Sequence, residues 1–244
     1  MTTVVLLELA VLLLVAGAVV SLVQARNLRA SGWTAVAAVG ASGLLVWIAA
    51  VRTLSSGPDA EATLMSVPAL GAALTVHVDA LSAVFLATVA TIAFLCTLFS
   101  VEYMTHFAAE GVAKYYPVLQ ILIAGIVGVV ATSDFFFFLV FWEVMTLASF
   151  FLVIYEGGSP VCQKAGLKYF VLGAVSSGIL LYGISLVYGS LGTLRLDEMA
   201  VAAAAPGAAD SRLLAAGWIL LLSGLLFKVA AAPFHVWTPD VYTG

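Results

Sequence analysis

Long apolar segments constrain this chain more than any other feature of its sequence. Hydrophobic residues make up 64% of the 244 residues and charged residues only 9%, whereas soluble domains carry roughly 45–50% and about 25%. The apolar residues fall into blocks of about 20, the length that a helix needs to cross a bilayer. Because so few polar side chains cannot cover a water-facing surface, a soluble single-core protein is excluded. We expect an integral membrane protein.

The charge and the cysteine content exclude several classes of function. The net charge is −4 and no basic run occurs, so nucleic acid is not an expected partner. Cys96 and Cys162 lack the spacing of zinc ligands, of an iron–sulfur cluster or of a disulfide framework. Nucleotide-binding loops and flavin motifs are also missing from the sequence. We expect no cofactor in this chain, so partners would supply any redox chemistry.

The apolar blocks predict an all-α, polytopic transmembrane bundle of about seven helices. Irregular backbone is not tolerated facing lipid, so each block is expected to be helical. The expected spans are residues 4–23, 33–51, 80–100, 117–132, 135–155, 165–189 and 213–234. Residues 1–112 contain the first three spans and residues 113–244 the other four. Only Ser133 and Asp134 join spans four and five, which predicts a tight antiparallel pair with Asp134 capping the fifth helix.

Lysine and arginine residues in the connecting loops predict the orientation. One side carries Arg26, Arg29, Lys114 and Lys164, and the other carries Arg52, Arg195 and Arg212. Basic loops tend to stay in the cytoplasm, so this four-to-three distribution favours an N-terminus outside. The first block contains Glu8 and has no basic segment before it, which indicates a retained helix rather than a secretory signal.

Three ionisable residues lie inside the expected spans. Glu143 lies about 12 Å into the fifth span, Lys228 lies well inside the last, and Lys168 lies about one turn into the sixth, within reach of the headgroups. A charge at the centre of a span costs about 2.5–3.5 kcal/mol and usually marks an ion or proton pathway. Glu143 and Lys228 are therefore candidates for a proton relay. A static buried ion pair is the alternative, and for Lys168 both readings stay open.

The last span also contains a proline shortly after its lysine. Pro233 cannot donate a backbone hydrogen bond and would leave the Val229 carbonyl unpaired, so we predict that the helix breaks at Pro233. Interrupted helices beside charges are typical of transporter sites. The alternative is that the membrane helix ends at Ala232 and that Pro233 begins a loop.

Two further patterns predict packing rather than chemistry. Gly166, Gly173 and Ser177 share one face of the sixth span, where small side chains allow another backbone to approach closely. The four consecutive phenylalanines at residues 135–138 are expected to contact lipid and the membrane interface.

Three stretches of the sequence resemble a known family in the family's order. They are FLVFWEVMTL at residues 138–147, KYFVLGAVSSG at 168–178 and FKVAAAPFHVWTPDVY at 227–242. They are similar to the antiporter-like membrane subunits of respiratory complex I, a family shared with Mrp cation/proton antiporters and the membrane arms of energy-converting hydrogenases. The resemblance covers roughly residues 75–244, and the first two spans match only in hydropathy.

The resemblance implies a proton-translocating subunit of about fourteen helices, with two inverted five-helix repeats that each contain a broken helix. The matching relay residues are Glu143, Lys228 and Lys168, with His235, Pro233 and Asp240 in support. Residues 113–244 would then form part of the first repeat, without its eighth helix. A fragment, a truncated product and one half of a split subunit all remain open.

The function implied by the resemblance is proton translocation in a redox-driven complex of the NADH:quinone oxidoreductase type. The chain would be a translocase subunit without a redox centre, in a bacterial or archaeal plasma membrane. Expected partners are other membrane subunits, a peripheral redox arm and the lipid bilayer. The alternatives are a subunit of an Mrp-type antiporter or energy-converting hydrogenase, and a structural membrane subunit that transports nothing.

Overall fold

Long apolar helices dominate the computed structural model, which describes residues 2–110, 114–155, 159–205 and 212–243. The main helices are α1 (Thr3–Val23), α2 (Leu28–Ser56), α3 (Ala80–Tyr103), α4 (Tyr115–Ala131), α5 (Phe135–Val153), α6 (Pro160–Leu191) and α8 (Arg212–Lys228). Within the described residues, α1, α2, α3, α5 and α6 are long and apolar enough to cross a membrane. Helices α4 and α8 have 17 residues each. The structure therefore agrees with a helical membrane bundle but does not establish seven spans.

Shorter elements occupy the connections. They are β1 (Ala62–Val67), η1 (Pro68–Leu70), β2 (Ala72–Val76), η2 (Met104–Glu110), α7 (Leu196–Ala203), η5 (Phe234–Trp237) and α9 (Thr238–Thr243). Strands β1 and β2 form an antiparallel hairpin in which Ala62 lies opposite Val76. Gly71, at φ +63°, makes the left-handed turn before β2. The sequence analysis did not predict this hairpin.

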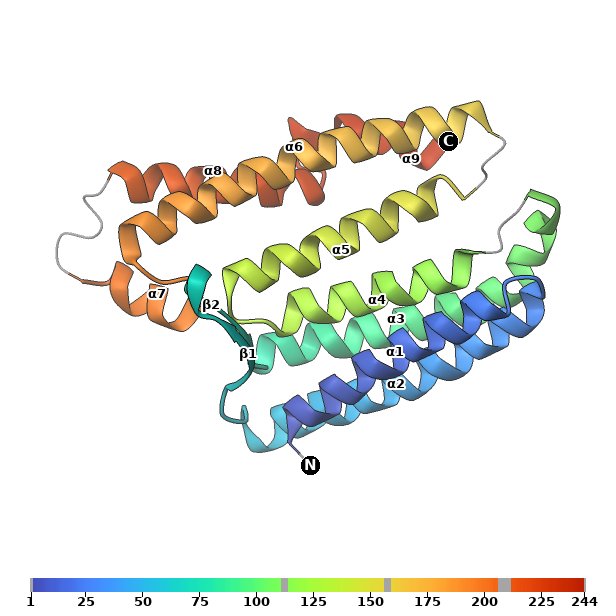
Figure 1. The fold of residues 1–244 in the computed structure, drawn as a ribbon, viewed down its shortest axis with the longest axis horizontal. Helices are drawn as coiled ribbons and strands as arrows, with labels where there is room; N and C mark the ends of the chain where they lie inside the picture. The colour runs from blue at the N-terminus through green and yellow to red at the C-terminus, as the bar shows by residue number, and fades with distance from the viewer. Residues whose placement is uncertain (1, 111–113, 156–158, 206–211, 244) are drawn as a thin grey trace.

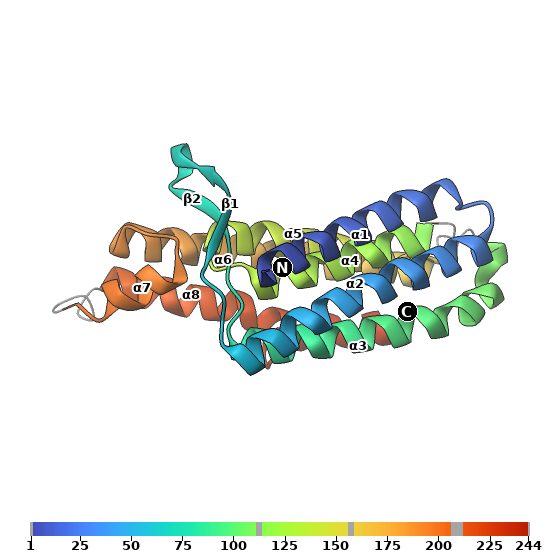
Figure 2. The same cartoon turned by 90° about the horizontal axis from the view of Figure 1, so that it is seen from below.

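The helices run roughly along one axis (Figure 1). Helices α1, α2, α3 and α4 pack together, α5 lies between α4 and α6, and α8 packs along α6. The hairpin and α7 lie at one end of the bundle, and Figure 2 shows the hairpin projecting from it. The α1–α2 turn and η2 lie at the other end. This places Arg26 and Arg52 at opposite ends, as predicted, while the orientation of the N-terminus stays a prediction.

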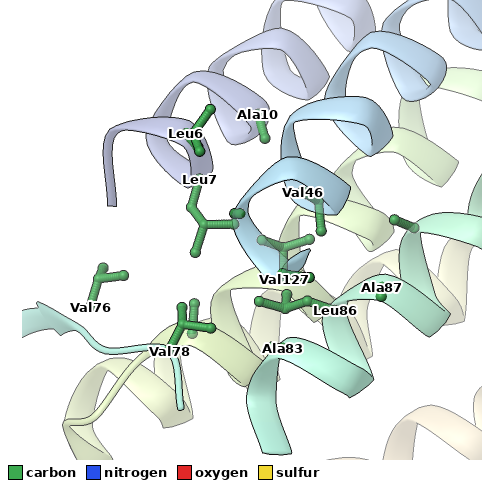
Figure 3. Packing of buried hydrophobic residues seen from close by; sticks show 14 of the residues in the cluster. Leu6, Leu7, Ala10, Val46, Val76, Val78, Ala83, Leu86, Ala87 and Val127 are labelled. Atoms are coloured by element: carbon green, nitrogen blue, oxygen red, sulfur yellow. The ribbon is translucent and has the colours of Figure 1, made fainter. Parts of the chain in front are cut away.

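A buried apolar cluster joins the first four helices (Figure 3). Leu7 of α1, Val46 of α2, Leu86 of α3 and Val127 of α4 all belong to it. Val76 at the end of β2 closes the cluster at the hairpin end. The apolar contact therefore fixes α4, and α4 in turn supports α5.

Helix α5 begins at a buried aspartate, as predicted. The Asp134 carboxylate accepts the backbone N–H groups of Phe136 at 2.8 Å and Phe137 at 3.2 Å. It also accepts the N–H of Ala73 in β2 at 3.1 Å. The predicted tight pairing of α4 and α5 is confirmed by Gly128, where an added Cβ would lie 2.3 Å from the Phe141 ring.

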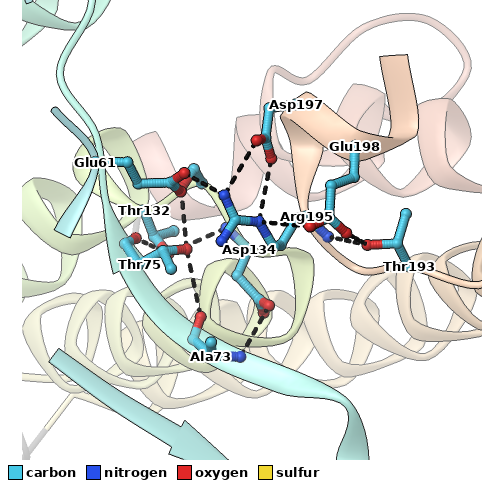
Figure 4. A network of polar contacts seen from close by, with 10 residues as sticks. Glu61, Ala73, Thr75, Thr132, Asp134, Thr193, Arg195, Asp197 and Glu198 are labelled. Carbon is cyan, nitrogen blue, oxygen red and sulfur yellow. Dashed lines mark hydrogen bonds and ion pairs between the residues drawn. The ribbon is translucent and has the colours of Figure 1, made fainter. Parts of the chain in front are cut away.

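Arg195, the residue that precedes α7, joins the hairpin to α7 (Figure 4). Its guanidinium pairs with Glu61 before β1, with Asp197 at 3.0 Å and with Glu198 at 3.2 Å. The hydrogen bond from Arg195 holds the pKa of the Asp197 carboxyl below its usual value of 3.8. We call Glu61, Asp134, Arg195, Asp197 and Glu198 the hairpin clasp.

Two of the four phenylalanines at the start of α5 do not face lipid. Phe135 and Phe137 are 7% and 6% exposed and lie in a buried cluster with Trp142 and Leu194. The prediction of lipid contact was wrong for these two rings. The sequence did not show that the segment leading into α7 folds back over the beginning of α5.

Small residues bring α6 against its neighbours. An added Cβ on Gly166 would lie 2.1 Å from the side chain of Ile154, which follows α5, and one on Gly183 would lie 2.5 Å from the backbone nitrogen of Leu221 in α8. Gly166 therefore accommodates a neighbouring side chain, whereas the sequence predicted that another backbone would approach this face. The equally close approach to α8 at Gly183 fixes the position of α8.

We expect Gly183→Ala to destabilise the protein by about 1–3 kcal/mol, because its methyl group would overlap backbone that cannot rotate away. Gly178→Ala is the matched control on the same helix, since an added Cβ there meets nothing within 4 Å. Thermal unfolding in detergent should lower the Tm of the first variant only. Equal Tm values for the two variants would contradict this account of α6–α8 packing.

Two aspartates of the clasp should differ in their contribution to stability. Asp134→Ala should cost about 2 kcal/mol or more, because it leaves several buried N–H groups unpaired. Asp197→Ala should cost less than about 1 kcal/mol, because its side chain is 57% exposed.

The pH dependence gives a second measurement on Asp197. Its pKa is lowered on folding, so its contribution is present above about pH 4 and is lost as the pH falls further. The difference in Tm between wild type and Asp197→Ala should accordingly disappear in acid. A difference that persists below the pKa of Asp197 in the folded protein would exclude Arg195 as its cause.

Candidate functional site

The candidate site is built where α8 ends. The helix stops at Lys228, and Ala230 takes a left-handed backbone conformation with φ +53°. The chain continues through a cis Ala232–Pro233 peptide bond into η5 and α9. The predicted break is therefore present, but it begins at Lys228, ahead of Pro233.

The end of α8 is held by a tryptophan from beyond the break. Trp237 of η5 donates its indole N–H to the carbonyl of Phe227 at 3.2 Å. The same indole packs on Phe227, with ring centroids 5.9 Å apart, and on Tyr169 of α6 at 5.1 Å. The broken segment is thus fixed to both α8 and α6.

The Lys228 ammonium points into the bundle and contacts hydroxyl groups. Its Nζ donates to the Tyr169 hydroxyl at 2.5 Å and to Thr146 Oγ1 of α5 at 3.2 Å. The ammonium also lies 5.1 Å from the centroid of the Tyr169 ring and 5.9 Å from that of Trp142, distances at which aromatic rings attract cations. Lys228 is half-buried and is coordinated from two neighbouring helices.

Glu143 lies one helical turn before Thr146 on α5, half-buried, with Oε1 inaccessible to solvent and without a hydrogen-bond partner in the described residues. Residues three apart on a helix share a face, so the carboxylate and the Lys228 contact lie on one side of α5. Among the described side chains, however, no ion pair within 4.0 Å joins Glu143 to Lys228. Glu143 and Thr146, the α5 residue that Lys228 contacts, lie on successive turns of α5. The two charged groups themselves form no ion pair.

Lys168 is placed apart from Lys228, although its neighbour Tyr169 contacts the ammonium. Its Nζ pairs with Asp240 of α9, and the two side chains are 38% and 49% exposed. His235 is exposed in η5, and no hydrogen bond among the described residues connects it to this group. The ion pair links α6 to the segment that follows the break.

Three hydroxyl residues of the site were missed by sequence reasoning: Thr146, Ser149 and Tyr169. Tyr169 is 4% exposed and shares a 2.6 Å hydrogen bond with Ser149 Oγ. All three fall inside or next to the motifs that identified the charges, but hydroxyl side chains in helices commonly bond only their own backbone. Nothing in the sequence indicated that the Lys228 ammonium would lie among these hydroxyl groups.

A separate cavity of about 550 Å³ lies at the hairpin end. Its polar lining includes Asp59, Glu61, His77, Asp79 and Asp197. In the described part of the chain, no three His, Cys, Asp or Glu side chains are grouped closely enough to hold a metal ion.

Two family profiles match the chain. The profile described as "NADH:quinone oxidoreductase/Mrp antiporter, TM" matches residues 132–244. The profile described as "NADH-Ubiquinone oxidoreductase (complex I), chain 5 N-terminus" matches residues 64–116. The first of these contains all the site residues described above.

Curated relatives agree with these profiles. NADH-quinone oxidoreductase subunit N of Sphingopyxis alaskensis is 38% identical over 198 residues, which cover 81% of this chain and 40% of that protein. The subunit N of a Caulobacter species is 48% identical over 141 residues, covering 56% of this chain and 29% of the relative. The chain thus spans less than half the length of these relatives.

Solved structures share the fold. A membrane-bound sulfane sulfur reductase, an archaeal respiratory membrane complex, matches 95% of this chain and 47% of its own with a TM-score of 0.78 and 26% identity. The Mrp complex of a Dietzia species matches 96% of this chain and 25% of its own with a TM-score of 0.78 and 27% identity. Respiratory complex I of Thermus thermophilus matches 95% and 47% with a TM-score of 0.66 and 28% identity.

Proposed function

Because the chain belongs to the family of antiporter-like membrane subunits found in NADH:quinone oxidoreductases and Mrp antiporters, we propose that it forms part of a proton path in a redox-driven membrane complex. One observation carries the proposal. The Lys228 ammonium lies at the broken end of a helix, bonded to neutral hydroxyls. A buried carboxylate oxygen of Glu143, one turn of α5 before the Thr146 contact, has no hydrogen-bond partner among the described residues.

Neither group has a direct charge partner among the described residues. A lysine in a direct ion pair is held charged by its partner, whereas Lys228 is bonded to groups that remain neutral. Lys228 would exchange a proton with water entering the bundle at the break. An ionised Glu143 would favour the charged lysine, and a neutral Glu143 would favour its deprotonation.

The interaction between two such charges is large enough to change the protonation of one of them. For scale, any two unit charges about 6 Å apart interact by about 3 kcal/mol at an effective dielectric constant of about 20. Moving the charges apart until that interaction is halved would change the ratio of protonated to deprotonated lysine about tenfold, since about 1.4 kcal/mol corresponds to one pKa unit. The two titrations would be coupled and would belong to the pair.

Lys168 would act at the end of the same path. Its ion pair with Asp240 ties α9 to α6, so a change of charge at either residue would loosen the segment after the break. Pro233 and His235 would support the path by maintaining that break. Other membrane subunits and a peripheral redox arm would supply the rest of the path and the electron transfer.

Replacing either central charge should abolish most transport in the assembled complex. We expect Glu143→Ala and Lys228→Ala to lower redox-driven proton pumping roughly tenfold or more, because each removes a group that must take up or release charge. Pumping is measured in proteoliposomes alongside the redox reaction, and assembly is checked separately. Normal pumping by both variants would refute the relay.

A double variant separates transport from scaffolding. If the charges only fix the packing, replacing both together with apolar residues of similar size should leave assembly and pumping intact. The proposed function requires the opposite: normal assembly with lost pumping.

A second candidate function is cation/proton exchange, favoured by the match to the Mrp complex over nearly the whole chain. In that case the same two charges would couple proton movement to sodium movement. Sodium should then stimulate proton flux severalfold in vesicles without any redox substrate, and Lys228→Ala should remove that stimulation. Flux that needs a redox substrate and ignores sodium would exclude this candidate.

A further inference from the structure

The hydroxyl groups around Lys228 form a short hydrogen-bonded group that joins α5 to α6. Thr146 donates its hydroxyl hydrogen to the carbonyl of Trp142 at 2.8 Å. Ser149 directs its hydrogen toward the carbonyls of Met145 and Thr146, both at 2.9 Å. Each hydroxyl has one hydrogen, and Thr146, which donates its own to the Trp142 carbonyl, accepts from the Lys228 ammonium.

The Lys228 ammonium determines which way Tyr169 donates its hydrogen. An ammonium can only donate, so the Tyr169 oxygen accepts from Lys228 and its own hydrogen is left to bond Ser149 Oγ, 2.6 Å away. The phenol oxygen of Tyr169 therefore presents a lone pair to the Lys228 ammonium, 2.5 Å away. Both hydroxyls that touch the ammonium accept from it.

The phenol is fixed in place from several sides. Tyr169 is 4% exposed, and its ring packs against Trp237 of the broken segment. Ser149 of α5 fixes its hydroxyl group. The position of the acceptor is therefore set jointly by α5, α6 and η5.

We propose that Tyr169 is a positioning residue, oriented by Ser149, which holds the Lys228 ammonium in its charged state and separate from Glu143. This inference rests on the proposed function, because it assigns the resting position of the lysine in that proton path. The titratable groups on the surrounding elements are Glu143 on α5, Lys168 and Tyr169 on α6, His235 in η5 and Asp240 on α9.

The test is the pH profile of redox-driven pumping by the whole complex in proteoliposomes. Tyr169→Phe keeps the ring and removes the acceptor, so the lysine should lose its proton more readily. We expect pumping to fall roughly threefold to tenfold at about pH 8 and to stay near wild type at about pH 6. Ser149→Ala should change the profile in the same direction, and Ser149→Thr, which retains a hydroxyl, should restore it.

Tyr182→Phe is the matched control. Tyr182 lies on the same helix and is 60% exposed, so its profile should equal that of wild type. A uniform loss at every pH in Tyr169→Phe would indicate a merely structural role and overturn the proposal. If the complex with Tyr169→Phe fails to assemble, the pH profile of Ser149→Ala is the deciding measurement. An unshifted profile in Ser149→Ala would also overturn the proposal.

The outcome with Lys228→Ala distinguishes the two proposals. Normal pumping by Lys228→Ala refutes the proton path itself. Lost pumping in Lys228→Ala, together with unshifted profiles in Tyr169→Phe and Ser149→Ala, refutes only the role of Tyr169.

Discussion

An ammonium group within a membrane bundle must be supplied with acceptors, and the C-terminal third of this protein is organised around that requirement. Lys228 ends α8, and the backbone turns away immediately afterwards at Ala230. Acceptors come from α5 and α6 rather than from a carboxylate. This choice matters because hydroxyls stabilise the ammonium without fixing it as firmly as a buried ion pair would.

The remainder of the fold keeps α5, α6 and α8 in place for this contact. The apolar cluster of the first four helices fixes α4. Close contacts at glycines then hold α5 against α4 and α8 against α6. At the hairpin end, Asp134 fixes the first turn of α5 and Arg195 ties α7 to the hairpin. The charges of the clasp lie outside the spanning segments, where carboxylates and a guanidinium can stay ionised, whereas the charges inside the bundle are few and separated.

The sequence predicted much of the site at the level of individual residues. Glu143 and Lys228 were identified because charge inside an apolar block is costly, and the break near Pro233 because proline cannot continue a helix. The cap at Asp134 followed from an equally local rule. The hairpin was missed because its strands are short, and the burial of Phe135 and Phe137 depends on a segment some sixty residues away in the chain.

The sequence by itself determined that this chain is a helical membrane protein, where its apolar helices run and which charges need an explanation, because these depend on hydropathy and local backbone chemistry. Only the tertiary structure decided that Lys228 bonds Tyr169 and Thr146 rather than Glu143, that Lys168 pairs with Asp240, and that the break begins at the lysine. Those outcomes depend on how α5, α6 and the segment after α8 pack against one another. The direction of a side chain across a helix interface is set by its neighbours in space, which the order of residues along the chain does not reveal.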